Sequence, residues 1–293
     1  MYDKISKKEN FRYVLITAAR NEEKYIENTI QSVNKQTIIP LKWVIVSDRS
    51  VDRTDEIVQK YAKEHKYIEL LRLHGDGERS FGAQVRAINA GYQILENIPY
   101  DYICNVDADV TFQENYFEMI LGRFKKDERL GIAGGYIYEE AGGVFTPHFS
   151  NRSYLVANAA QMFRRSCFEN MGGYIQLKYG SHDTWVNVMA WKLGWKVENI
   201  PEIQVFHHRP TSSSLGGFYK SKWNDGLMDY TIGNHPVYQV GKCILRFREK
   251  PYVIASAVRM AAYIWAYLKR EERGVSKDFV KYYRRMQFRR FFF

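Results

Sequence analysis

Residues 102–110 read YICNVDADV, an apolar run that ends in two aspartates, Asp107 and Asp109. Such a run predicts a strand buried on both faces, with the aspartates at the point where the strand ends. Two carboxylates this close together repel each other unless a cation or hydrogen-bond donors compensate them. A hard divalent ion does so when it binds carboxylates together with the phosphate oxygens of a substrate. The alternative is a turn in which Asp109 caps the helix that follows.

Strand and helix signals alternate on the N-terminal side of this segment. Three further apolar runs predict strands, at residues 13–18, 43–47 and 68–73. Apolar residues at helical spacing predict helices at residues 22–36, 54–64, 82–95 and 115–124. This order predicts an α/β fold of the Rossmann-like kind, with a mostly parallel sheet and helices on both faces.

The C-terminal side is less regular. We predict strands at residues 132–138, 159–164 and 197–207, and a helix at residues 184–193. After Pro236 the pattern becomes helical and basic to the end of the sequence.

Polar residues follow three of the predicted parallel strands. Arg20 and Glu22 follow the first strand, Asp48 follows the second, and Asp107 and Asp109 follow the fourth. Ligands of such sheets bind beyond the carboxyl ends of the strands. We therefore expect these side chains to meet in one crevice that binds an anionic ligand through a metal ion.

The motifs, taken in order, resemble those of family 2 glycosyltransferases, which have the GT-A fold. The resembling segments are TAARNE at residues 17–22, VSDRSVDRT at residues 46–54, the helix with Gly82, Ala87, Asn89 and Gly91, the D-x-D of Asp107 and Asp109, MGGY at residues 171–174, and residues 182–195 from His182-Asp183 to Trp195. The resemblance runs from about residue 11 to residue 208 and keeps the order of the motifs.

The resemblance implies roles for individual residues. Asp48 is similar to the aspartate that contacts the nucleobase, Asp107 to the carboxylate near ribose and metal, and Asp109 to the metal ligand. Asp183 is similar to the general base that takes the acceptor proton, which implies inversion at the anomeric carbon. Its alternative role is to cap the helix that it begins.

Further residues are assigned to the same site. We assign Ala18, Arg20, Glu22 and Arg86 to the donor site, with Arg79 as a weaker candidate for the diphosphate. We assign His207 to the metal. We assign His182 and Trp185 to the acceptor side. The expected cofactor is Mn²⁺ or Mg²⁺. A UDP-sugar is the favoured donor, with a GDP- or dTDP-sugar as the alternatives, because Ser47, Arg49 and Arg20 depart from the family pattern beside the nucleobase.

The net charge of +10 is unevenly placed. Residues 242–293 carry 14 Lys and Arg against 4 Asp and Glu, so the remainder of the 293 residues is neutral. We therefore expect a GT-A domain at residues 1–241, with a donor half at about 11–130 and an acceptor half at about 131–210. Residues 242–293 are expected to form basic amphipathic helices. Such a tail fits an anchor on an anionic membrane surface, and the alternative is a helix packed on the domain.

Other features limit the class of protein. The three cysteines are far apart and suggest neither a disulfide framework nor a metal site, and residues 1–11 lack the apolar core of a signal peptide. No motif for nucleic acid accompanies the basic tail. We expect a cytoplasmic protein, peripheral on the inner face of the cell membrane, that acts on a glycan or lipid-linked acceptor in polysaccharide biosynthesis. The Gln-x-x-Arg-Trp pattern of processive relatives is absent, so we expect transfer of one sugar.

Two other functions are compatible with the same residues. One is a nucleotide-sugar-binding protein without catalysis. The other is a sugar nucleotidyltransferase, which also uses paired carboxylates, although the first turn lacks a glycine-rich loop for a triphosphate.

Overall fold

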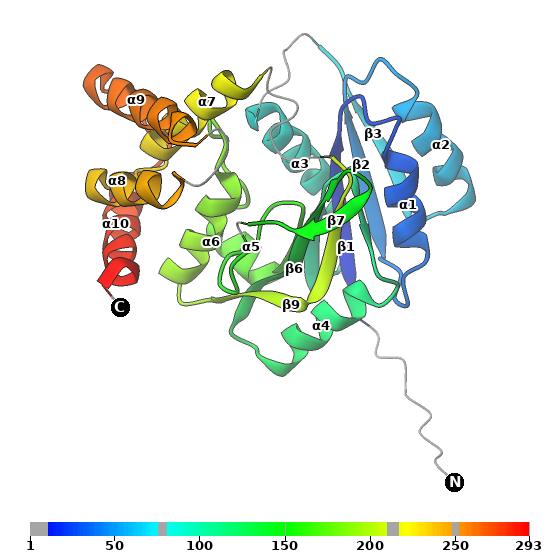
Figure 1. Cartoon of the computed structure of the whole chain (residues 1–293). Helices are drawn as coiled ribbons and strands as arrows, with labels where there is room; N and C mark the ends of the chain where they lie inside the picture. The colour runs from blue at the N-terminus through cyan, green and yellow to red at the C-terminus, as the bar shows by residue number, and fades with distance from the viewer. Residues whose placement is uncertain (1–10, 76–80, 150, 210–216, 248–251, 293) are drawn as a thin grey trace.

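The computed structural model describes residues 11–75, 81–149, 151–209, 217–247 and 252–292. A central sheet has helices on both faces, and a group of four helices stands at one end of it (Figure 1). The strands are β1 (Tyr13–Ala19), β2 (Lys42–Asp48), β3 (Ile68–Leu73), β4 (Tyr102–Val106), β5 (Val110–Phe112), β6 (Leu130–Ala141), β7 (Val144–Pro147), β8 (Ala160–Arg164) and β9 (Lys196–His207). The helices are α1 (Ile26–Asn34), α2 (Thr54–Glu64), α3 (Phe81–Leu95), α4 (Tyr116–Lys126), α5 (Arg165–Met171), α6 (His182–Lys192), α7 (Phe218–Thr231), α8 (Pro236–Leu245), α9 (Ile254–Lys269) and α10 (Lys277–Phe292).

The strands form one sheet in the order β3-β2-β1-β4-β8-β6-β9-β5, and β7 pairs with β6. The first four of these strands are parallel, as predicted. Antiparallel pairs enter with β8, which lies beside β4, and with β5, which lies beside β9. The α/β class with a parallel N-terminal half is confirmed.

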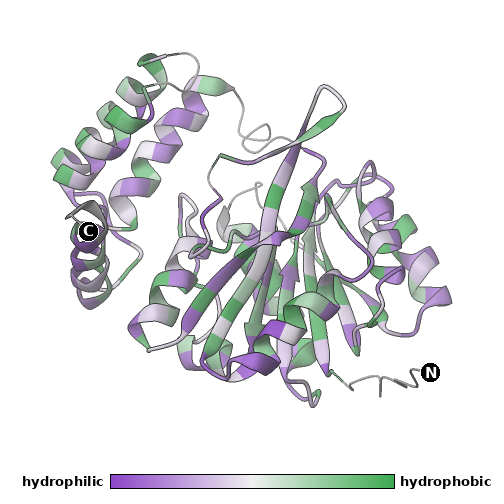
Figure 2. Cartoon of the chain, turned by 60° about the horizontal axis from the view of Figure 1, so that its bottom comes forward, coloured by the Kyte–Doolittle hydropathy of each residue, from purple (hydrophilic) through white to green (hydrophobic). Residues whose placement is uncertain are grey.

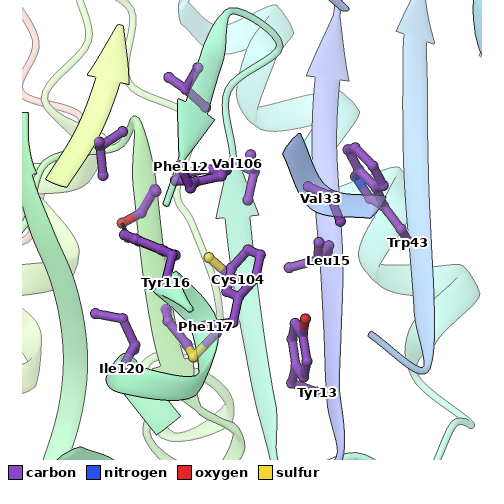
Figure 3. Packing of buried hydrophobic residues seen from close by; sticks show 14 of the residues in the cluster. Tyr13, Leu15, Val33, Trp43, Cys104, Val106, Phe112, Tyr116, Phe117 and Ile120 are labelled. Carbon is purple, nitrogen blue, oxygen red and sulfur yellow. Dashed lines mark hydrogen bonds between the residues drawn. The ribbon is translucent and has the colours of Figure 1, made fainter. Parts of the chain in front are cut away.

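Alternate residues of β1 show why these apolar runs form a two-sided sheet. Tyr13 and Leu15 point to one face, where they pack with α1, α2 and α4; Val14 and Ile16 point to the other, where they pack with α3. Figure 3 shows Tyr13 and Leu15 beside Trp43, Cys104 and Phe117 on the first face. Burial on both faces accounts for the nearly continuous apolar run of the strand.

Two short strands, one short helix and the 14-residue helix α7 escaped the sequence prediction. β5 has three residues, β7 has four and α5 has seven, so none carries enough periods of its hydrophobic pattern to be recognised. β5 matters for the site because its pairing with β9 sets Val110 opposite His207.

The helices α7 to α10 pack together at the far end of the sheet (Figure 1). Their contacts cross residue 241, since Asp229 of α7 pairs with Lys242 of α8 and Arg259 of α9. α10 packs on α6 by stacking Phe279 on Trp185. The domain boundary at residue 241 remains a prediction. α10 packs on the domain, which is the alternative to a membrane anchor that the sequence analysis gave. Within the described residues no helix is long and apolar enough to cross a membrane.

Candidate functional site

The turn between β4 and β5 carries Asp107 and Asp109, and neighbouring segments hold its backbone. The amide of Asp107 donates to the carbonyl of Ala159, at 2.9 Å, and the carbonyl of Asp109 accepts from the amide of His208, at 3.0 Å. The hydroxyl of Thr29 on α1 donates to the carbonyl of Ala108, at 2.9 Å. The backbone that carries the two carboxylates is thus held by residues from both the N-terminal and the C-terminal side of the turn.

Asp109 is buried and forms two ion pairs with residues at the end of β9. Its carboxylate lies 2.6 Å from Nη2 of Arg209 and 3.3 Å from Nε2 of His207. Burial raises the pKa of Asp109, but the hydrogen bond and charge of His207 and the charge of Arg209 outweigh it, so the pKa is lowered. Asp109 is therefore ionised.

Arg209 also joins Glu22 to this group, because the same Nη2 lies 2.9 Å from Oε1 of Glu22. Glu22 is buried at the end of β1, and its amide donates to the hydroxyl of Thr54. The guanidinium of Arg209 therefore joins residues at the ends of β1, β4 and β9. The parallel topology predicted that the ends of β1 and β4 would meet. The sequence reasoning missed Arg209, and its position directly after His207-His208 was the only signal for it.

Asp107 has a different environment from Asp109. It accepts hydrogen bonds from Gln84 of α3, at 3.3 Å, and from Asn158 before β8, at 3.2 Å. Burial and then the charge of Asp109 raise the pKa of Asp107 to about 7. Gln84 and Asn158 were not predicted, since a neutral amide has no motif of its own in the sequence.

The carboxylates of Asp107 and Asp109 fit a hard divalent ion, because their mutual repulsion raises the pKa of Asp107 and a cation would relieve it. His207 was also assigned to the metal. Burial lowers its pKa, but hydrogen bonds to Asp109 and Glu139 raise it to about 10, so a metal would have to displace a proton from its ring. No three His, Cys, Asp or Glu side chains within the described ranges are arranged to hold a metal.

A pocket of about 520 Å³ lies beside the end of β2. Asp48 and Arg86, both assigned to the donor, line it together with Arg49, His74 and Asn89. Asp48 is buried and pairs with Arg49 at 2.6 Å and with Arg20 at 3.7 Å. Two arginine side chains thus compensate the negative charge of Asp48, the residue to which the resemblance assigns a contact with the nucleobase.

The structure says less about Ala18 and Arg79, the other two residues that were assigned to the donor. Ala18 lies in β1 opposite Val46 of β2 and packs on the core of the face that α3 covers. Arg79 lies outside the described residues.

The start of α6 carries Asp183 and His182. Asp183 lies in the first turn of α6, after the N-cap residue Ser181, and one of its carboxylate oxygens accepts a hydrogen bond from the amide of Thr184, at 2.7 Å. The pKa of the buried Tyr174 is raised by burial and also by the charges of Cys104, Asp183 and Asp107. The charges of Asp183 and Asp107 thus act on the same tyrosine.

His182 and Trp185 are both buried residues of α6. His182 is 5% exposed, its ring lies 5.5 Å from that of Tyr174, and neither ring nitrogen has a hydrogen-bond partner. Burial lowers the pKa of His182 despite the nearby charge of Asp183. Trp185 packs on Phe279, so its contact with an acceptor remains only a prediction.

Comparison with protein families matches residues 14–184 to a family described as glycosyl transferase family 2. The chain is 22% identical over 238 residues to the probable glycosyltransferase YdaM of Bacillus subtilis, which covers 72% of this chain and 54% of that protein. It is 22% identical over 276 residues to the poly-beta-1,6-N-acetyl-D-glucosamine synthase of Staphylococcus aureus, which covers 86% of this chain and 62% of that protein. The chain spans about half the length of the curated relatives it matches.

Two solved structures share the fold. The mannosyltransferase PcManGT of Pyrobaculum calidifontis, in complex with GDP-Man and Mn²⁺, aligns with a TM-score of 0.60 at 14% identity over 89% of this chain and 88% of that one. S. aureus TarS, in complex with UDP-GlcNAc, aligns with a TM-score of 0.56 at 15% identity over 80% and 70%. The expected GT-A fold is confirmed.

Proposed function

The chain belongs to glycosyl transferase family 2, and on that premise we propose that it transfers one sugar from a nucleotide-sugar donor to a hydroxyl acceptor, with inversion. The observation that carries the proposal is the pairing of Arg209 with Glu22 and Asp109, at the same edge of the sheet as Asp107 and as the pocket lined by Asp48 and Arg86. Both lie at the carboxyl ends of the parallel strands, where ligands of such sheets bind.

In this proposal the pocket binds the nucleoside and the carboxylate cluster lies at the diphosphate. Asp48 accepts hydrogen bonds from the base, and Arg20 flanks it. Arg86 contributes a guanidinium suited to phosphate oxygens. UDP-GlcNAc and GDP-Man bound to proteins of the same fold support the nucleotide-sugar class, and a UDP-sugar is favoured.

Asp107 and Asp109 would hold Mn²⁺ or Mg²⁺, which would supply positive charge at the leaving diphosphate. The chain's own residues prepare this site. Gln84 and Asn158 orient Asp107 through two amide hydrogen bonds, and His207 and Arg209 keep Asp109 ionised.

Asp183 is proposed as the general base. A carboxylate at this place takes the proton of the acceptor hydroxyl as that oxygen attacks the anomeric carbon from the side opposite the diphosphate, which gives inversion. The bond to the amide of Thr184 occupies one oxygen of Asp183 and fixes the orientation of the carboxylate. The neutral ring of His182 lies beside it on the acceptor side.

The acceptor is proposed to be a glycan or a lipid-linked saccharide, reached at the inner face of the cell membrane. The basic charge of residues 242–293 supports this place of action, since cations are drawn to anionic lipid.

A thermal-shift screen of UDP-, GDP- and dTDP-sugars with and without Mn²⁺ tests the proposal. One nucleotide class should stabilise the protein only with Mn²⁺, and Asp48→Asn should weaken this stabilisation. Asp101→Asn, which changes an exposed aspartate paired with Arg12, serves as the matched control. Absence of stabilisation by all three classes would contradict the proposed donor.

A further inference from the structure

The outer face of α9 is apolar along its whole length. Ile254, Ile264, Trp265 and Leu268 are exposed, with Ala257 and Ala261 between them at helical spacing. Two polar residues of this helix, Ser256 and Arg259, are buried instead. α9 thus reverses the usual arrangement, in which a surface helix shows its polar face to water.

α8 is reversed in the same way. Val237, Val240, Ile244 and Leu245 are exposed, whereas Gln239 is buried against Asp229 of α7. Leu245 and Leu268 are each 76% exposed, which makes them the most exposed leucines of the two helices. Figure 2 shows hydrophobic residues along the helices that stand farthest from the sheet.

An internal ion cluster fixes the two reversed helices on α7. Arg259 of α9 binds the buried carboxylate of Asp229 through Nε, at 2.5 Å, and Nη2, at 3.0 Å. Lys242 of α8 binds the same carboxylate at 2.8 Å. Because buried charges are stable only when they are paired, this cluster explains how the polar groups can lie inside while the apolar groups lie outside.

We propose that the outer faces of α8 and α9 dock in the plane of a lipid bilayer with anionic headgroups. The interface of such a bilayer accepts an apolar helix face together with flanking cations. Lys269 and Arg270 are exposed at the end of the apolar face of α9, and the net charge of +10 of the whole chain lies in residues 242–293. α9 has 16 residues, about 24 Å of helix, which is short of a hydrocarbon core of roughly 30 Å, so it lies along the surface.

Aromatic residues at this face favour lipid over water. Trp265 of α9 is 41% exposed and lies 6.2 Å from the ring of Trp223 of α7, which is also partly exposed. Indole rings are enriched at the headgroup level of membranes. A second copy of the chain is a poorer occupant, because it would bring two segments of net charge +10 together.

The inference rests on the proposed function, because a lipid-linked acceptor requires the enzyme at a bilayer. It also narrows the anchor that the sequence analysis expected in residues 242–293. α10 uses Phe279 and Val280 for packing, whereas the docking face belongs to α9 and to α8, which begins before residue 242.

The test is flotation of the full chain with phosphatidylcholine vesicles that contain 30% phosphatidylglycerol. The double variant Leu245→Glu/Leu268→Glu should lower the fraction bound at least about tenfold, because two large apolar side chains no longer enter the interface. Val144→Glu is the matched control, since Val144 is 62% exposed on β7, away from the helices, and it should bind like the wild type.

Three results would overturn the proposal. The wild type stays with the buffer fraction, the double variant floats like the wild type, or light scattering shows a wild-type dimer that the double variant converts to a monomer. Donor hydrolysis is measured on the same samples to keep the two claims apart. Lost flotation with retained hydrolysis supports the docking face and leaves the transferase intact, whereas a wild type that floats but never consumes a donor contradicts only the proposed function.

Discussion

The guanidinium of Arg209 lies 2.6 Å from the carboxylate of Asp109 and 2.9 Å from that of Glu22. The positively charged side chain of Arg209 therefore contacts Asp109, the carboxylate that we assign as a metal ligand. Without it, two buried acids would lose the cation that they share, and such a loss is costly. Arg209 and a metal ion then compete for Asp109.

We expect Arg209→Gln to bind Mn²⁺ about tenfold to a hundredfold more tightly, because a charge-assisted hydrogen bond of about 1.5–3 kcal/mol no longer has to be displaced. Titration calorimetry of the donor-free protein measures this. Arg209→Lys, which keeps the charge, should stay near the wild type. Equal or weaker Mn²⁺ binding by Arg209→Gln would show that the two cations do not compete.

Asp183→Asn should lower kcat by about a hundredfold or more, since a positioned general base contributes 10²–10⁴-fold. Donor affinity should stay unchanged, because the base acts on the acceptor. Stability should change little, as the asparagine oxygen still accepts the amide of Thr184. Steady-state kinetics and donor titration separate these quantities, and a full kcat in the variant would return Asp183 to a purely structural role.

His182 predicts a dependence of stability on pH. Its pKa in the folded protein lies below the ordinary 6.5 because the ring is buried, so between these two values the unfolded chain binds more protons than the folded one. Stability should therefore fall as the pH drops below 6.5 and level off below the folded pKa. His182→Leu should remove this part of the decline and be no less stable at pH 7, since both ring nitrogens lack partners.

Urea unfolding of the two proteins from pH 7.5 to pH 4.5 measures the difference. Parallel curves for the variant and the wild type over this range would refute the assignment.

The sequence predicted the parts of the site that come from single strand ends. Asp48, Asp107 and Asp109 follow apolar runs directly, and the parallel order brings those ends together. It did not predict Arg209 or Asn158, because their contacts depend on how the antiparallel strands β5 and β8 return to the sheet. A three-residue strand such as β5 has no periodicity to recognise, yet its pairing with β9 places His207 and Arg209 on Asp109.

Basic amphipathic helices were expected in residues 242–293, but the burial of a charged residue among them was not. Arg259 instead points inward, because Asp229 lies on α7, thirty residues earlier in the chain. Such a reversal depends on a tertiary partner and has no local signal.

Asp229→Asn should lower the free energy of unfolding by about 3–5 kcal/mol, because it removes the buried carboxylate that Arg259 and Lys242 share and leaves the buried Arg259 with Asp225 alone. Burial raises the pKa of Asp229, but the charges of Lys242 and Arg259 hold it well below its usual range, so the group is ionised at neutral pH. Urea unfolding gives the value. Asp278→Asn, which breaks the exposed pair with Lys192, should cost less than about 1 kcal/mol. Similar losses in both variants would contradict the view that the buried cluster holds the helices.

The measurement that bears most directly on the central claim is the rate at which a nucleotide-sugar donor is consumed with Mn²⁺ in the wild type and in Asp109→Asn, with Asp101→Asn as the surface control. We predict that the rate falls at least about a hundredfold in Asp109→Asn, as when one charge-stabilising group is removed from an active site, and stays near wild type in the control. A rate in Asp109→Asn equal to that of the wild type, with the metal chelated, would contradict the claim that Asp107 and Asp109 form the donor site.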